Sequence, residues 1–233
     1  MITLAFDTCF GACSAALRLR GPDGIWTIRE DYREMATGHA EALLPMIERL
    51  VADAGIEFKD LRRIAVTIGP GSFTGARIGL SAARGFKLAL GVPVVALTSL
   101  MVMAARADAL LAGGQFGVAR AGAALVACVD ARGGNIYAEA FGEDVSEPLT
   151  PPKLWNPAEL AKALDGRRAI AVGSGGNLLA DAAGAGATAI LPGLQPHARH
   201  LALLADAAPY PASLDPLYLR QTDAKPMIAP ELA

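Results

Sequence analysis

The sequence predicts an α/β fold made of two related lobes. Hydrophobic periodicity indicates the order strand, strand, strand, helix, strand, helix, strand, helix over the first half of the 233 residues. A strand that ends on an aspartate, followed by a turn and another strand, occurs at Asp7 and again at Asp130. One such unit in each half is a weak internal repeat, which favours two related lobes. We place the first lobe at residues 1–113 and a shorter second lobe at residues 114–233.

The first half begins with three expected strands. The run "ITLAF" (2–6) is short and apolar, whereas residues 13–20 and 25–32 alternate on either side of the turn signal "GPDG". A helix is expected at 39–55, where Pro45 predicts a kink or marks the first turn. Its apolar positions recur at helical spacing: Leu43, Met46, Ile47, Leu50, Val51 and Ala54.

The rest of the first half alternates strands with helices. The apolar run at 64–68 has the length of a buried strand, and a glycine cluster follows it. We expect a helix at 72–90, a strand at 92–97 and a helix at 98–111 with a Thr/Ser start.

The second half opens in a similar way. The runs "AALVACV" (123–129) and "IYAEAF" (136–141) flank the turn "RGGN", and a proline-rich connection occupies 146–157. Asn156 before Pro157 is a good helix start. The other expected elements are a strand at 169–173, a short alanine-rich helix after "SGGN", a helix at 196–207 and an extended tail at 214–233.

Composition excludes several classes of protein. Hydrophobic residues make up 53% and charged residues 19% of the chain, so disorder does not describe it. No apolar run reaches the roughly 18 residues that a membrane helix needs, and no signal peptide opens the chain. We therefore expect a cytoplasmic protein that makes no contact with a membrane. The three cysteines fit reduced thiols. The net charge of −2 argues against nucleic-acid binding by the chain alone.

The glycine cluster "GPGSFTGARIGLSAARG" (69–85) holds either a nucleotide or another protein surface. It lacks the lysine of a Walker A loop, and its glycine spacing is one residue too long for the dinucleotide fingerprint. An anion at the N-terminus of a helix capped by Ser72 is one alternative. A smooth helix face lets a neighbour approach closely, and that neighbour is either the protein's own core or another subunit. This face consists of residues four apart: Gly71, Gly75, Gly79 and Ala83.

The acidic and histidine residues complete no catalytic pattern. Asp7 and Asp130 are candidates for paired carboxylates around a metal, but the fourth strand ends without the acid that ribonuclease H-like nucleases need. His39 is alone, and His197 and His200 have no matching third ligand. We therefore expect no metal site and no catalytic residues.

Five segments together resemble the TsaB (YeaZ) family, in order along nearly the whole chain. They are "LAFDTCFGACSAAL" (4–17), "HAEALLP" (39–45), "GPGSFTGARIGL" (69–80), "VDARGGNIY" (129–137) and "PLYLR" (216–220). The resemblance implies an actin-like ATPase (ASKHA, ribonuclease H-like) fold, with a mixed sheet flanked by helices in each of two lobes. It also implies a role in making N6-threonylcarbamoyladenosine (t6A) at position 37 of tRNA.

The same resemblance implies the partners. They are TsaD, a catalytic paralogue that moves the threonylcarbamoyl group to tRNA, and the ATPase TsaE. A second copy of the chain forms a homodimer when the protein is alone, and tRNA is met only through the complex. The resemblance implies that the TsaD pair and the homodimer both form by helical packing between N-terminal lobes. In this sequence that packing maps to the helices at 39–54 and 72–90.

The catalytic features of the paralogue are incomplete in this sequence. TsaD carries His-x-x-x-His on its first long helix, whereas here His39 is followed four positions later by Leu43. Cys9 stands where working ASKHA kinases usually have the glycine that admits phosphate. We expect a non-catalytic subunit without a cofactor, and leave open whether ATP or ADP binds at the interface of the complex. The alternative is an ATP-binding ASKHA-type enzyme or hydrolase with residual activity.

Two sets of site residues follow from this resemblance. The predicted interface consists of Gly71, Phe73, Gly75, Ile78, Gly79, Ala83, His39, Leu43, Ile47 and Val51. A vestigial nucleotide site would consist of Asp7, Thr8, Asp130, Gly173, Gly175 and Gly176.

Overall fold

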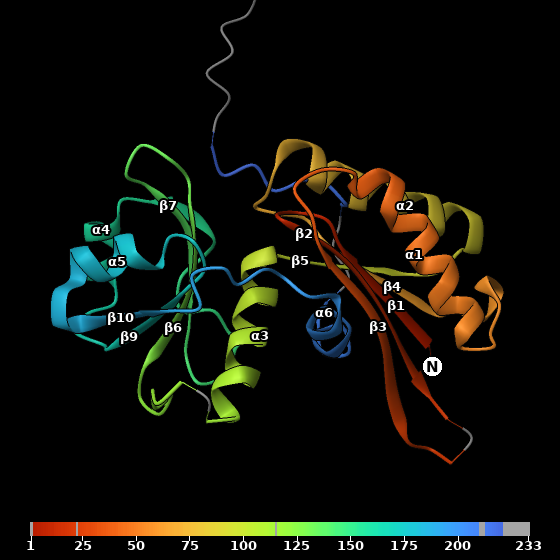
Figure 1. Cartoon of the computed structure of the whole chain (residues 1–233), viewed down its shortest axis with the longest axis horizontal. Helices are drawn as coiled ribbons and strands as arrows, with labels where there is room; N and C mark the ends of the chain where they lie inside the picture. Colours follow the sequence, from red (N-terminus) through yellow and green to blue (C-terminus); the bar gives the residue numbers. More distant parts are fainter. Residues whose placement is uncertain (1, 22, 115, 210–212, 221–233) are drawn as a thin grey trace, which may run out of the picture.

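Two five-stranded sheets form the framework of the chain in a computed structural model, which describes residues 2–21, 23–114, 116–209 and 213–220 (Figure 1). The strand order is β3-β2-β1-β4-β5 in the first sheet and β10-β9-β6-β7-β8 in the second. The strands are β1 Ile2–Asp7, β2 Ala12–Arg20, β3 Trp26–Glu34, β4 Arg63–Thr67, β5 Val94–Leu97, β6 Ala124–Asp130, β7 Ile136–Phe141, β8 Lys153–Trp155, β9 Ala169–Val172 and β10 Ala187–Ile190.

The two sheets have the same topology. β1 pairs antiparallel with β2 and parallel with β4, and β6 pairs antiparallel with β7 and parallel with β9. An antiparallel edge strand (β3 or β8) and a parallel edge strand (β5 or β10) complete each sheet. The prediction of an α/β fold with two related lobes, each containing a mixed sheet, is therefore confirmed.

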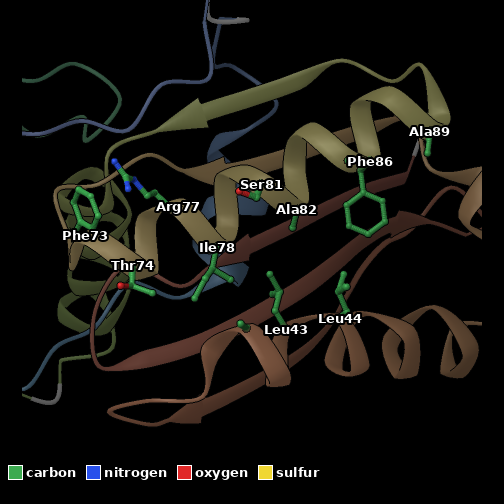
Figure 2. Close-up of a pocket in the computed structure, with 12 residues that line it drawn as sticks. Leu43, Leu44, Phe73, Thr74, Arg77, Ile78, Ser81, Ala82, Phe86 and Ala89 are labelled. Atoms are coloured by element: carbon green, nitrogen blue, oxygen red, sulfur yellow. The ribbon is translucent and has the colours of Figure 1, made fainter.

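Helices cover both faces of each sheet. α1 and α2 lie side by side on the outer face of the first sheet, with a groove between them (Figure 2). α4 and α5 cover the outer face of the second sheet, and α3 and α6 lie between the sheets (Figure 1). The helices are α1 His39–Asp53, α2 Phe73–Leu90, α3 Ser99–Ala112, α4 Pro157–Ala163, α5 Gly176–Ala183 and α6 Ala198–Leu204, with short 3₁₀ helices at Phe58–Asp60 and Gly184–Gly186.

Alternation along β1 serves two separate cores. Leu4 and Phe6 pack beneath α1 and α2, whereas Ala5 faces α6 on the other side of the sheet. Ala16 and Ala65 flank Ala5 on the α6 side, so that the sheet face is smooth there. Small residues on this face allow α6 to approach the strands closely.

The two inner helices each pack on the sheet of the other half of the chain. α3, which follows the first sheet in sequence, packs on the second sheet through residues such as Leu100 and Met103. α6 follows the second sheet but packs on the first, and Asp206 just after it pairs with Arg18 and, at 3.1 Å, with Arg63. A boundary between residues 113 and 114 stays a prediction, because these helices link the lobes in both directions.

Sequence patterns missed three local features. β8 and β10 were not expected, since β8 lies within the proline-rich connection and β10 directly follows an alanine- and glycine-rich stretch. Pro45 lies inside α1 in its second turn, on the exposed side, and the helix continues through it.

The expected tail at 214–233 is described only to residue 220, without helix or strand, and its remainder lies outside the described residues. No helix within the described ranges has the length and apolar character needed to cross a membrane.

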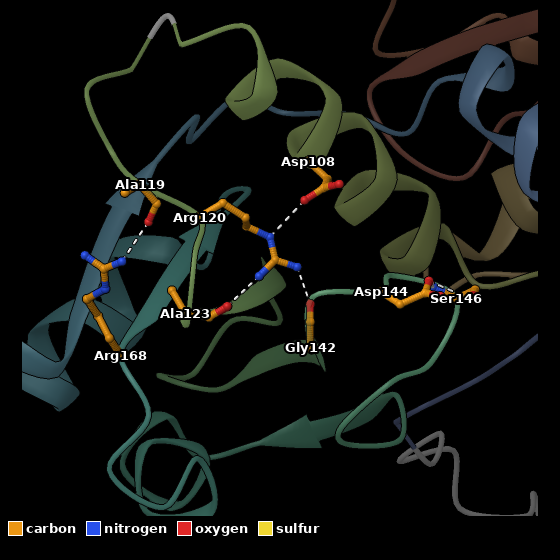
Figure 3. Close-up of polar contacts among 8 residues, drawn as sticks. All are labelled: Asp108, Ala119, Arg120, Ala123, Gly142, Asp144, Ser146 and Arg168. Carbon is orange, nitrogen blue, oxygen red and sulfur yellow. Dashed lines mark hydrogen bonds and ion pairs between the residues drawn. The ribbon is translucent and has the colours of Figure 1, made fainter.

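Arg120 ties the second lobe together at the end of α3 (Figure 3). Its largely buried guanidinium pairs with Asp108 of α3, with Nε and Oδ1 2.8 Å apart, and donates to the carbonyl oxygens of Ala123 and Gly142. Arg168 nearby donates to the Ala119 carbonyl from an exposed side chain. Arg120 therefore joins α3, the start of β6 and the end of β7 at one point.

Arg120→Ala is expected to destabilise the protein by about 2–3 kcal/mol, because it leaves two backbone carbonyls and one carboxylate without their shared donor. Urea unfolding followed by circular dichroism measures this change. Arg168→Ala serves as the matched control, with a change within about 0.5 kcal/mol expected for an exposed side chain. Equal stability of the two variants would contradict the role assigned to Arg120.

Candidate functional site

α2 follows β4 through the loop of residues 68–72 and forms the centre of the site. The Ser72 side chain caps the helix by accepting a hydrogen bond from the Gly75 amide at 2.9 Å, and Gly91 ends it in the left-handed conformation at φ 66°. The helix expected at 72–90 is thereby confirmed. Its two opposite faces have different neighbours, and this difference decides which residues are available to a partner.

The glycine stripe of α2 faces the protein's own interior. A Cβ atom on Gly75 would lie 2.2 Å from the Thr8 carbonyl oxygen, and one on Gly71 would lie 2.6 Å from the Cys9 carbonyl oxygen. A Cβ atom on Gly79 would lie 2.9 Å from the Thr8 hydroxyl oxygen. Only glycine permits this approach of α2 to the turn after β1.

The assignment of the stripe to an intermolecular interface is therefore corrected. Backbone and side-chain atoms of Thr8 and Cys9 already occupy the space beside it, so no partner helix can enter there. Of the two neighbours that the sequence left open, the protein's own core is the one observed. The corrected residues are Gly71, Gly75, Gly79 and Ala83.

Four predicted interface residues of α1 also face inward. Ile47 and Val51 belong to the core beneath α1. His39 is buried, and its Nε2 donates to the Phe10 carbonyl at 2.9 Å. Leu43 is 1% exposed and reaches only the floor of the groove. Helical periodicity placed these residues on one face, and the structure identifies it as the face that packs on the sheet.

The Thr8 hydroxyl holds α2 in place against the turn after β1. It donates to the Gly75 carbonyl at 2.7 Å and accepts from the Gly79 amide at 3.1 Å. These two backbone groups are four residues apart, so the hydroxyl bridges successive turns of the helix. In addition, the Ser72 amide donates to the Cys9 carbonyl at 2.7 Å.

Asp7 lies at the end of β1 and has no exposed surface. Thr67 donates to its Oδ1 at 2.5 Å and the Cys9 amide approaches the same oxygen at 3.4 Å. Among the described residues, Oδ2 has no hydrogen-bond partner. Burial raises the pKa of Asp7 from 3.8 to about 6. A carboxylate in this environment is covered by its own protein and is not open to a ligand.

The corresponding region of the second lobe has a different construction. Asp130 is exposed, and its Oδ1 accepts a hydrogen bond from the Arg132 amide at 2.7 Å. A Cβ atom on Gly173 would lie 2.4 Å from the Cys128 carbonyl, and one on Gly175 would lie 2.8 Å from an Ile136 methyl group. Close packing of the β9–α5 turn therefore accounts for these two glycines.

The vestigial nucleotide site stays a prediction. Its residues divide into a covered pair, Asp7 and Thr8, and an exposed carboxylate, Asp130. Gly176 packs near the Ala171 carbonyl, where a Cβ atom would be 3.3 Å away. Within the described part of the chain, no group of three or more His, Cys, Asp or Glu residues is arranged to hold a metal ion.

An apolar groove of about 810 Å³ lies between the outward faces of α1 and α2 (Figure 2). Leu44 of α1 is 50% exposed, and Phe73 at the start of α2 is 54% exposed. In Figure 2, Leu43 and Leu44 point across the groove toward Ile78, Ala82 and Phe86 of α2. Phe73 and Ile78 of the predicted interface therefore lie on this accessible surface.

The groove has its own stripe of small residues, separate from the glycine stripe that the sequence indicates at positions 71–83. Ser81, Gly85 and Ala89 recur every four positions along α2 and line the groove. They are offset by two positions from Gly79, or about 200° around the helix, and so lie on the opposite face from the buried stripe. A Cβ atom on Gly85 would meet nothing within 4 Å. The second repeat of small residues four positions apart, at 81, 85 and 89, is the sequence pattern that could have indicated the groove face.

Comparison with known proteins gives consistent matches. The family model described as TsaD, tRNA N6-adenosine threonylcarbamoyltransferase, matches residues 33–168. The tRNA threonylcarbamoyladenosine biosynthesis protein TsaB of Escherichia coli is 33% identical over 62% of this chain, and the match spans 56% of that protein's length. TsaB of Haemophilus influenzae is 30% identical over 74% of this chain and 71% of its own.

A solved structure extends these matches to nearly the whole chain. YeaZ from Pseudomonas aeruginosa superimposes with a TM-score of 0.79 at 27% sequence identity, covering 94% of this chain and 99% of that one. The shared architecture is the two-lobed actin-like fold, with equivalent mixed sheets and flanking helices. The family match, the sequence identities and this superposition together establish that the chain belongs to the TsaB/YeaZ family.

Proposed function

We propose that the chain is a non-catalytic subunit of the bacterial t6A synthesis complex, which binds and activates TsaD together with the ATPase TsaE. Membership of the TsaB/YeaZ family supports a role in t6A biosynthesis. The observation that carries the proposal is the exposed apolar groove between α1 and α2. Monomeric proteins rarely leave a large continuous apolar surface in water, so such a surface indicates a partner.

The shape of the groove favours a helical partner. The small residues Ser81, Gly85 and Ala89 allow a second helix to come close to α2. The TsaD family model matches the residues that form α1 and α2, which supports a partner with two similar helices of its own. Two such pairs facing each other form a four-helix contact. A homodimer of the free chain would use the same surface.

The covered state of Asp7 and Thr8 supports the non-catalytic part of the proposal. The space beside the end of β1 is filled by α2, and both side chains are bonded into the protein. In this proposal TsaD supplies the chemistry and contacts tRNA. A bound ATP or ADP would belong to the joint between the subunits and not to the isolated chain.

Gly85→Leu is expected to abolish the TsaD complex and the homodimer while keeping or raising the melting temperature. Its side chain enters open groove space, and replacing a helical glycine adds up to about 1 kcal/mol of helix stability. Light scattering on a size-exclusion column, with the chain alone and mixed with TsaD from the same organism, measures both pairings.

Two variants serve as controls for Gly85→Leu. Gly193→Leu makes the same change in open space away from the groove and is expected to leave both pairings intact. Gly75→Leu is expected to unfold the first lobe, because its Cβ atom alone overlaps the Thr8 carbonyl. A Gly85→Leu protein that still pairs like the wild type would place the interface elsewhere.

A pH titration tests whether Asp7 is covered in solution. Its raised pKa means that the folded chain keeps a proton which the unfolded chain has lost between pH 3.8 and about 6. The contribution of Asp7 to stability therefore falls as pH rises through this window, by about 3 kcal/mol, and is level above it. This pH-dependent loss is absent in Asp7→Asn. Urea unfolding at pH 4 to 8 is therefore expected to show that the difference in unfolding free energy between wild type and Asp7→Asn shrinks toward low pH. Parallel profiles would mean that Asp7 meets solvent.

The alternative function is an ATP-binding ASKHA-type enzyme or hydrolase. The unpartnered Oδ2 of Asp7 is the observation that favours it. We expect calorimetry of the isolated chain with ATP and Mg²⁺ to give no binding, because the approach to Asp7 and Thr8 is filled. Micromolar binding that is lost in Asp7→Ala would favour the enzyme over the accessory subunit.

A further inference from the structure

Arg77 contacts two stacked aromatic side chains at one end of the groove. Its guanidinium carbon lies 3.5 Å from the centroid of the Phe73 ring, and its Nε donates to the Tyr218 hydroxyl at 2.7 Å. The rings of Phe73 and Tyr218 stack with centroids 5.6 Å apart. Figure 2 shows Arg77 beside Phe73, beyond Ile78 and away from the Phe86 end.

Tyr218 is brought to this point by the last described segment of the chain. The Leu217 amide donates to the Ile68 carbonyl at 2.8 Å, just before α2. Arg84, farther along the helix, donates to the Leu214 carbonyl at 2.8 Å. Residues 213–220 are therefore bound both to the loop before α2 and to Arg84 within α2, and the position of the Tyr218 hydroxyl is set by the fold.

The charge of Arg77 is not matched by a carboxylate. Among the residues that the structure describes, it forms no ion pair, whereas Arg84 on the same helix pairs with Asp215. Within residues 2–21, 23–114, 116–209 and 213–220, the groove is lined by no acidic side chain. Arg77 is exposed, and its terminal nitrogens are not used by its contact with Tyr218.

This arrangement lowers the cost of using Arg77 in binding. A free arginine side chain loses rotamer entropy when a partner fixes it in one position. Stacking on Phe73 and the hydrogen bond to Tyr218 already restrict it before a partner arrives. A planar guanidinium restrained in this way presents its remaining donors in the geometry that suits a carboxylate.

We infer that Phe73, Arg77 and Tyr218 form a carboxylate-recognition element, which selects and orients the helix that docks in the groove. The occupant it fits is a partner helix with an apolar face along α1 and α2 and an acidic side chain at the Arg77 end. Charge complementarity is the basis of this choice, because the described lining of the groove contains one cation, Arg77, among apolar or hydroxyl-bearing residues. The inference rests on the proposed function, and it adds the chemistry that distinguishes the proper partner from other apolar helices.

The test measures TsaD binding by calorimetry at two salt concentrations. Arg77→Gln is expected to weaken binding by about 10- to 100-fold and to reduce its salt dependence, since it removes a charge pair that becomes covered in the complex. Arg77→Lys is expected to bind TsaD with an affinity between those of wild type and Arg77→Gln, because lysine keeps the charge without the planar fork. Tyr218→Phe keeps the ring stack but removes the acceptor for Nε, and a smaller loss of about 3- to 10-fold is expected.

Lys87→Gln is the matched control. Lys87 lies on the same helix and loses the same charge, but it borders a different surface hollow with Arg84 and Leu88. Its affinity for TsaD is expected to stay within about twofold of wild type, as for an exposed charge outside the contact. Melting temperatures of all variants verify that the groove is intact.

The outcomes separate this inference from the proposed function. Wild-type binding together with unchanged affinity and salt dependence in Arg77→Gln would overturn the inference and leave the proposed function standing. No binding of folded TsaD by the wild-type chain would overturn the proposed function and the inference with it. Loss of the homodimer alone in Arg77→Gln would also overturn the inference, because the carboxylate would then belong to a second copy.

Discussion

The close contact between the glycine stripe of α2 and the turn after β1 determines how the first lobe is arranged. Backbone atoms of Thr8 and Cys9 occupy the space that side chains would take at positions 71 and 75. The Thr8 hydroxyl then fixes the rotation of the helix about its axis by bridging two backbone groups in successive turns. That rotation places the second small-residue stripe toward α1 and solvent, and so the groove exists because the opposite face is filled.

The same contact also accounts for the covered state of the first-strand aspartate. Asp7 ends a strand whose following turn is pressed against α2, and it is bonded to Thr67 rather than facing an open cleft. In the second lobe the glycines at 173 and 175 serve the packing of a turn on β6. The two-lobed architecture is retained, while the spaces near both aspartate-ending strands are organised around internal packing.

The sequence predicted the strands of the first lobe, α2 with its cap, and the internal repeat, because periodicity and capping are local properties. It grouped Phe73 and Ile78, which line the groove, with the glycine stripe of α2, which packs against the protein's own interior. Glycine spacing indicates that something approaches closely, yet it carries no sign of whether that neighbour is internal. Exchange of α3 and α6 between the sheets, and the return of Tyr218 to Arg77, depend on contacts between distant parts of the chain that local patterns do not encode.

The position of α6 makes the first lobe dependent on a segment that is synthesised after the strands of the second sheet. Ala5 and its neighbours in the sheet are covered by residues 198–205, and Arg18 and Arg63 form ion pairs with the carboxylate of Asp206. Because translation proceeds from the N-terminus, a nascent chain on the ribosome carries α1 and α2 on an unfinished lobe. The inner face of the first sheet is therefore covered only after residues 198–206 have left the ribosome, long after the strands of that sheet.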